Sequence, residues 1–179
     1  MGATEHPPVP GQAQFIAWWL ALPRESCVPT LADTLDKADP TFAPWTCIID
    51  MANEDLLKIR LFGTGLAQAF GEITGQNYLD YMPNELRGPI AKSHRVVIDT
   101  PCGRLTRASA ITNSGREVVL GMVSLPVSHK GKLTQIAKYV RIIDTLDYRE
   151  GLSKVYRVQH QSWLDIGAGL PEQTPHAVS

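Results

Sequence analysis

From Arg104 to Ile143 the chain runs RLTRASAITNSGREVVLGMVSLPVSHKGKLTQIAKYVRII, and this stretch decides the fold. Three runs rich in apolar residues, 104–112, 117–127 and 133–143, are separated by the polar, glycine-containing segments 113–115 (NSG) and 129–131 (HKG). Runs of this length joined by tight turns predict three antiparallel strands in a meander. The middle run carries apolar residues on both of its faces, which predicts a strand that is covered on both sides.

Two further strands are expected before the meander. Residues 46–51 (TCIIDM) and 57–62 (LKIRLF) are apolar runs close together in the sequence, and they predict an antiparallel hairpin. Short helices are expected among the glycines of 63–75, and a longer helix from Gly88-Pro89 to Ile98, because proline suits the first helical position. The expected fold is α+β, a five-stranded antiparallel sheet with helices on one face.

An amphipathic helix is predicted near the N-terminus. Within residues 12–22, large apolar side chains recur at helical spacing in one stripe formed by Phe15, Trp18, Trp19 and Leu22. The two adjacent tryptophans point about 100° apart on a helix. We therefore expect a second copy of the chain to cover one of them in a homodimer. The proline-rich residues 1–11 predict a disordered lead-in.

The domain is expected to span residues 12–148, followed by a helix and tail at 149–179. Between about residues 150 and 166, apolar residues recur at helical spacing in a stripe interrupted by Gln159 and formed by Leu152, Val155, Tyr156, Trp163 and Leu164. Two interpretations of this helix stay open. It packs permanently on its own domain, or it moves when a ligand shifts the sheet and so carries a signal.

Composition and charge exclude several classes of protein. The 179 residues are 44% hydrophobic and 20% charged, which is typical of one globular domain. A net charge of -1 gives no electrostatic reason for nucleic acid or an anionic membrane as a partner. No apolar run approaches the ~20 residues that cross a bilayer, and the N-terminus has no signal-peptide pattern. The three cysteines lack the spacing of a zinc site or a disulfide framework, so a cytoplasmic protein is expected.

The order of the predicted elements and several motifs resemble a PAS sensor domain, in particular the short bacterial PAS proteins of the alphaproteobacterial type. The resemblance covers about residues 15–148, and its motifs are FIAWWLALP at 15–23, PW at 44–45, RLFGTG at 60–65 and FGEITG at 70–75. It implies a five-stranded antiparallel sheet with a small cavity beneath the helices. The resemblance also implies that this cavity senses a ligand or contacts a protein, usually without catalysis. We therefore expect a stand-alone sensory or interaction module, not an enzyme, that acts through a partner protein.

Five residues are candidates for binding a small ligand. Phe70, Tyr78 and Tyr81 cluster where the resemblance places the closure of the cavity, and phenol groups can orient a ligand. His94 lies near the apolar face of the long helix. Arg107 lies in a predicted strand, where an inward-facing arginine would hold a carboxylate. Ordinary packing of the aromatic residues and a solvent-facing arginine are the alternatives.

One cofactor and one other class of function remain open. Haem-binding PAS domains take their axial histidine from the helix that carries His94, so haem is a candidate, against a hydrogen-bonded core histidine. Flavin photochemistry is not expected, because no cysteine lies between Gly63 and Pro83. No metal site is expected. The alternative function is a cone-shaped α+β enzyme of the steroid-isomerase type with Asp50 as its base, which requires Asp50 in an apolar pocket beside Tyr78 or Tyr81.

Overall fold

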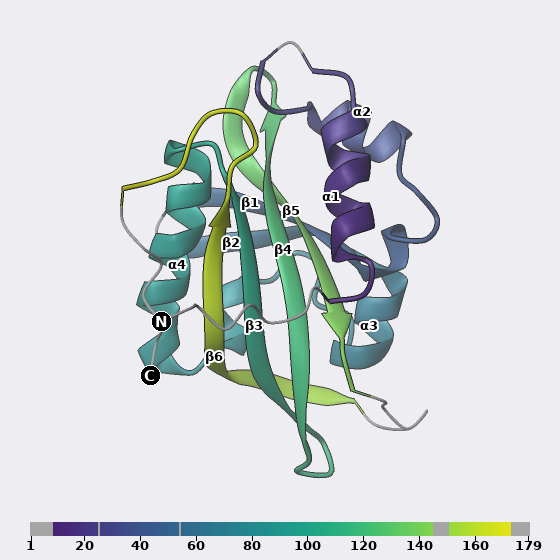
Figure 1. The fold of residues 1–179 in the computed structure, drawn as a ribbon. Coiled ribbons are helices and arrows are strands. Elements are labelled where there is room, and N and C mark those ends of the chain that lie inside the picture. Colours follow the sequence, from purple (N-terminus) through teal and green to yellow (C-terminus); the bar gives the residue numbers. More distant parts are fainter. Residues whose placement is uncertain (1–8, 25, 54, 145–150, 173–179) are drawn as a thin grey trace, which may run out of the picture.

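The fold is built on a six-stranded antiparallel sheet (Figure 1). The computed structural model describes residues 9–24, 26–53, 55–144 and 151–172, except the side chains of residues 154 and 156. In space the strands follow the order β2-β1-β5-β4-β3-β6, and each neighbouring pair is antiparallel. Their bounds are β1 (Thr46–Asn53), β2 (Leu56–Phe62), β3 (Gly103–Thr112), β4 (Glu117–His129), β5 (Lys132–Ile142) and β6 (Leu152–Leu164).

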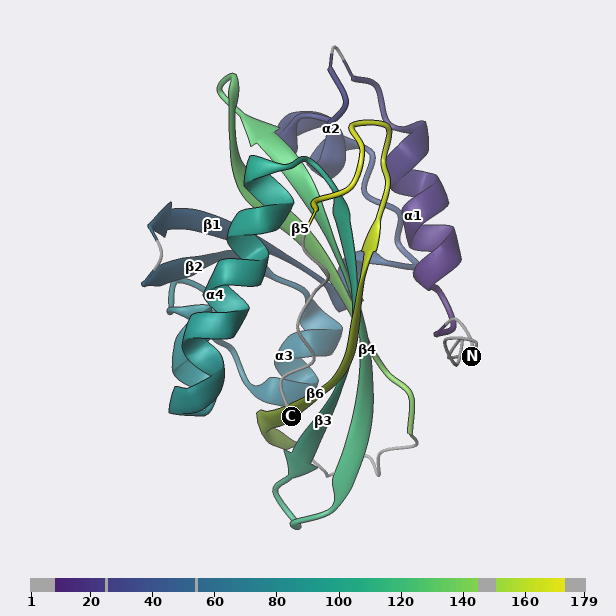
Figure 2. The same cartoon turned by 60° about the vertical axis from the view of Figure 1, so that its left-hand side comes forward.

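Helices cover both faces of this sheet. Figure 2 shows α3 and α4 on one side of the long strands and α1 and α2 on the other. The α+β class is thus confirmed, with the helices between β2 and β3 on one face as expected. None of the described helices is long and apolar enough to cross a bilayer. The helices are α1 (Gln12–Ala21), α2 (Leu31–Asp36), α3 (Thr64–Phe70) and α4 (Asn84–Asp99), with short 3-10 helices η1 (Ala43–Trp45) and η2 (Tyr78–Tyr81).

The sheet separates two hydrophobic cores, because side chains along each strand alternate between its faces. On β4, Leu120 and Met122 belong to the core beneath α3, η2 and α4, which we call the inner face. Val123 and Leu125 belong to the core beneath α1 and α2, which we call the outer face. All four side chains are buried, so the expectation that this strand is covered on both sides is confirmed.

The expected C-terminal helix is wrong. Residues 152–164 form β6, which pairs with β3 and adds a sixth strand to the five expected. The register between the two strands shifts three times, and at each shift β6 has one residue more than β3. Buried side chains therefore recur at every third residue, at Leu152, Val155 and Val158. This spacing imitates a helical period although the segment is a strand. Residues 149–150 and 173–179 of the expected helix and tail lie outside the described residues.

The predicted N-terminal helix is present as α1, and it packs on the outer face of its own sheet. The Phe15 ring stacks on Tyr139 with centroids 5.0 Å apart. Trp19 is fully buried, while the half-buried Trp18 donates a hydrogen bond from Nε1 to the Lys37 carbonyl at 2.9 Å. Because the chain itself covers both tryptophans, they give no reason for a dimer contact. The homodimer stays a prediction.

Two element boundaries differ from those expected. Val9, within the expected disordered lead-in, is buried, and a Cβ on Gly121 of β4 would lie 2.3 Å from its Cγ2 atom. Residues 1–8 lie outside the described residues. Helix α4 begins at Asn84, and Pro89 lies inside it at an exposed position. The proline is tolerated near the start of the helix, where it removes one backbone hydrogen bond from the second turn.

Gly63 fixes how α3 leaves β2 and reaches the inner face. A Cβ at Gly63 would lie 2.5 Å from the backbone oxygens of Ala43 and Pro44. Backbone atoms cannot rotate away as the end of a side chain can. The close approach of η1 therefore requires glycine here, and it positions Leu66 and Phe70 of α3 over the sheet.

We expect Gly63→Ala to lower the free energy of unfolding by about 1–3 kcal/mol, the usual cost of overpacking. Gly88→Ala is the matched control. Its Cβ would meet nothing within 4 Å in α4, so it should raise stability by about 0.5–1 kcal/mol. Urea unfolding followed by circular dichroism measures both. Equal effects of the two substitutions would contradict this account of Gly63.

Candidate functional site

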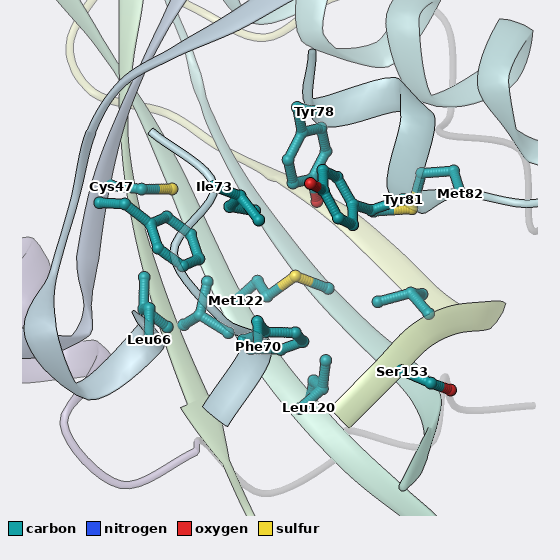
Figure 3. A pocket seen from close by; sticks show the side chains of 13 residues that line it. Cys47, Leu66, Phe70, Ile73, Tyr78, Tyr81, Met82, Leu120, Met122 and Ser153 are labelled. Carbon is teal, nitrogen blue, oxygen red and sulfur yellow. The ribbon is translucent and has the colours of Figure 1, made fainter. Parts of the chain in front are cut away.

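An apolar cavity lies on the inner face between the sheet and helices α3 and η2 (Figure 3). Phe70, Tyr78 and Tyr81, the three aromatic residues expected at a ligand site, all line it. Its free volume is about 40 Å³, which is room for about three water molecules. The rest of the wall is formed by Cys47, Phe62, Leu66, Ile73, Met82, Leu120, Met122, Val140, Ser153 and Val155.

A row of polar side chains crosses the sheet beside this cavity. Arg104 on β3 lies opposite Ser124 on β4, Ser124 lies opposite Lys138 on β5, and Lys138 lies opposite Cys47 on β1. Directly opposed residues share a sheet face. Since Cys47 lines the cavity, the other three side chains also belong to the inner face. We call Arg104, Ser124 and Lys138 the polar row; each is at most 2% exposed.

Lys138 is held by Tyr78. Its Nζ donates a hydrogen bond to Tyr78 Oη at 2.5 Å and lies 4.3 Å from the centroid of the Tyr78 ring. Burial, and then the positive charge of Arg104, lower the pKa of Lys138 to about 7. Burial raises the pKa of Cys47 to about 11 and that of Tyr78 above its usual range, so both groups are neutral at pH 7. Neither of them supplies a negative charge for the ammonium group.

Helix α4 places His94 against Arg104. His94 Nδ1 lies 2.8 Å from the Ile90 carbonyl oxygen, which only accepts, so this nitrogen carries the proton. Arg104 Nη2 then donates to His94 Nε2 at 3.1 Å, and Arg104 Nη1 donates to Ser93 Oγ. Burial, followed by the charge of Arg104, lowers the pKa of His94 well below its usual range. The neutral His94 therefore positions the guanidinium.

The polar row carries positive charge and hydrogen-bond donors that are not used. Burial lowers the pKa of Arg104 to about 10, so its guanidinium remains charged at neutral pH. In the described part of the chain, neither Arg104 nor Lys138 pairs with a carboxylate. Arg104 Nε and Ser124 Oγ have no hydrogen-bond partner among the residues that the structure describes. Fully buried cations are rare unless they are paired, so this arrangement has the chemistry of an anion-binding site.

Arg107, which we expected at the ligand site, does not face the cavity. It lies three residues after Arg104 on the same strand, and an odd separation along a strand reverses the face. Arg107 therefore shares the outer face with Leu105, which packs in the outer core. Arg104 is the inward-facing arginine of β3.

Arg104 and Lys138 were not among the residues predicted from the sequence, although a signal for Lys138 was present. Lys138 is in phase with Ile136 and Val140, two apolar positions of the same strand. A lysine at an inward position of a buried strand is uncommon. The signal for Arg104 is weaker, because its in-phase neighbours Ala108 and Ala110 are small and do not mark a buried face strongly.

Asp50 does not meet the requirement of an isomerase-type base. Its neighbours on β1, Ile49 and Met51, pack in the inner core, so Asp50 points away from Tyr78 and Tyr81. The Asp50 carboxylate accepts from Arg60 Nη1 at 3.5 Å and from the amide of Gln135. It is therefore a paired carboxylate on the other face of the sheet.

His94 does not fit the role of a haem ligand. Its Nε2 lone pair accepts from the Arg104 guanidinium at 3.1 Å, so it is not available to iron. The cavity of about 40 Å³ is also far smaller than the ~300–1,000 Å³ of typical cofactor pockets. Among the described residues, no group of three or more His, Cys, Asp or Glu side chains is placed to hold a metal ion.

Comparison with known proteins gives a weak structural likeness. No family model matches the chain. No curated protein matches its sequence. The chain is similar to a solved structure described as "Structure of an RNA-binding Light-Oxygen-Voltage Receptor", with 16% sequence identity and a TM-score of 0.46. The match covers 68% of this chain and 35% of the other, so this chain spans about a third of that protein's length. A likeness this weak says nothing about the residues of the site.

Between pH 7 and 8.5 we expect the free energy of unfolding to rise by roughly 1–2 kcal/mol. The unfolded chain keeps the lysine proton up to its ordinary pKa of 10.5, whereas folded Lys138 loses it near pH 7, so the unfolded state binds more protons in this window. At higher pH, the raised pKa of Cys47 makes the free energy of unfolding fall with rising pH, because the folded state then binds more protons than the unfolded state. Urea unfolding at several pH values measures the slope.

Lys138→Met removes the buried amine, so we expect it to flatten this slope. Because a chain of similar volume replaces an unpaired buried cation, we also expect unchanged or increased stability at pH 7. Lys132→Met, at an exposed position of the same strand, is the control and should keep the slope. A Lys138→Met protein with the full wild-type slope would show that another group titrates.

Proposed function

We propose that this chain is a PAS-type sensory module that binds a small ligand in the inner-face cavity and passes the signal to a separate partner protein. The observation that carries this proposal is the apolar cavity whose wall includes Tyr78. Tyr78 accepts a hydrogen bond from the buried Lys138, which pairs with no carboxylate among the described residues. Packing alone does not call for a lysine there, whereas a binding site commonly combines apolar walls with a few polar groups. The order of elements up to β5 also agrees with the PAS resemblance.

The cavity also touches the edge of the sheet. Ser153 and Val155 of β6 line it together with Leu120 and Met122 of β4. A ligand in the cavity therefore contacts β6, the strand at one end of the sheet order. If β6 has two arrangements that bind the ligand differently, the ligand shifts their populations. We propose that a partner protein recognises this edge.

Filling the cavity should abolish ligand binding. Val140→Phe places a ring at a lining position, and Val119→Phe on β4, a half-buried position outside the cavity wall, is the matched control. The probes are 1-propanol, propionamide and propionate. We expect at least one to raise the melting temperature of the wild type and the control, because a hundredfold excess over Kd adds about 2.7 kcal/mol to the free energy of unfolding. Val140→Phe should not respond.

Mass spectrometry of compounds released from the protein purified without added ligand completes this test. If no compound is released and none of the three probes shifts the melting temperature, the cavity is not a binding site. A probe that stabilises Val140→Phe as strongly as wild type binds elsewhere, and it would contradict the proposal as well.

The signal through β6 can be tested by hydrogen exchange. With a stabilising probe at saturation, we expect amide protection in residues 152–158 to rise more than in residues 56–62 of β2, at the opposite edge of the sheet. Equal changes in both strands would reflect global stabilisation only. Protection of β6 that is high and unchanged by the probe would remove β6 as the output.

A further inference from the structure

We infer that the ligand carries a carboxylate and that the polar row binds it. Arg104 and Lys138 hold a short-chain aliphatic monocarboxylate whose hydrocarbon part lies in the apolar cavity. This inference rests on the proposed function, and it names the chemical class of the ligand.

Charge is the first reason. Arg104 and Lys138 are at most 2% exposed, and they are separated on the inner face by one residue of the intervening strand, Ser124. Each buried cation costs a large free energy of desolvation, and the two also repel one another. The side chains that form hydrogen bonds with them, Tyr78, His94 and Ser93, are neutral and do not offset the positive charge. A bound anion supplies the missing negative charge.

The free donors are the second reason. Within the described residues, Arg104 Nε and Ser124 Oγ have no partner, and Lys138 donates to one oxygen there, Tyr78 Oη, although an ammonium group has three N–H bonds. These donors belong to three successive cross-strand positions, whose Cβ atoms lie about 4.5–5.5 Å apart. A carboxylate has two oxygens with about four acceptor sites. Its hydrogen-bonding capacity therefore matches the unused donors of the polar row.

The cavity selects a small ligand with an apolar end. Cys47 and Tyr78 line the cavity, and Lys138 lies opposite Cys47 and donates to Tyr78, so Lys138 lies directly behind these two wall residues. The remaining wall is almost wholly apolar, with Leu66 and Met122 among its members. Such a wall favours methylene groups. Phosphate, with four polar oxygens, would direct some of them at apolar side chains.

Binding of a carboxylate should depend on pH through Lys138. The groups that face Lys138 are Arg104 on β3, Cys47 on β1 and Tyr78 on η2, together with His94 on α4, whose pKa Lys138 also lowers. Of these five, the pKa of Lys138 alone lies between pH 6 and 9. Because a carboxylate prefers the protonated amine, its affinity should fall as pH rises above 7, by at most about tenfold per pH unit.

The test compares propionate with propionamide, which has the same shape but no charge. Calorimetric titration of the full chain at pH 6, 7, 8 and 9 gives both affinities. We expect propionate to bind more tightly than propionamide at pH 6 and to weaken with rising pH, while the amide does not. Lys138→Met and Arg104→Met should each weaken propionate by about 10- to 100-fold and leave propionamide nearly unchanged.

Two control substitutions and one further variant complete the test. Lys132→Met removes a cation at an exposed position of β5, and Arg107→Met removes one from the outer face of β3, so both variants should bind propionate as wild type does. Tyr78→Phe removes the oxygen that now accepts from Lys138 and keeps the ring. We expect it to bind propionate more tightly, even if the Arg104 variant fails to fold.

The possible results separate the inference from the proposed function. If propionamide binds as tightly as propionate at pH 6 and Val140→Phe loses both, the cavity binds ligands but the carboxylate inference is overturned. Binding of inorganic phosphate that depends on Lys138, without binding of propionate, overturns it too. If none of these compounds binds wild type and no ligand is released from the purified protein, the inference and the proposed function both fail.

Discussion

Two cations buried on one face of the sheet are the constraint on which the inner half of this protein depends. Arg104 and Lys138 repel each other, and burying each charge in an apolar core costs desolvation free energy. Neighbouring elements supply polar groups to both of them. Helix α4 presents Ser93 and the neutral ring of His94 to the guanidinium, and η2 presents the Tyr78 hydroxyl to the amine. On the inner face, the polar row across β3, β4 and β5 thus lies beside an apolar cavity beneath α3.

The sheet was predictable from the sequence where its strands are regular and its turns are short. The meander turns contain Gly115 and Gly131, whose φ angles of 85° and 72° favour glycine, and such local signals are visible in one sequence. The last strand was not predictable in this way. Its bulges change the spacing of buried residues from two to three. Spacing of apolar residues is the signal that distinguishes strands from helices, and here it predicted a helix. The cause lies in the pairing with β3, which the segment alone does not reveal.

The candidate site was likewise predictable from the sequence only in part. Phe70, Tyr78 and Tyr81 come from one short stretch of sequence, so their clustering was predictable, and all three line the cavity. The polar row joins three strands, and its members meet only through cross-strand register. An error of one residue in the phase of a strand exchanges its faces. That error led to Arg107 in place of Arg104, since both lie in a run whose inward residues are small.

The two ends of the sheet differ in how they resist the addition of a further strand. At β2 the backbone of Ile59 already exchanges hydrogen bonds with Gly75 and Gln76, so part of this edge is occupied. At β6 the repeated bulges interrupt the even spacing of N–H and C=O groups that an incoming chain would need. The irregularity that made this segment look helical thus also makes it a poor template for intermolecular β-pairing, which protects a long terminal strand against aggregation.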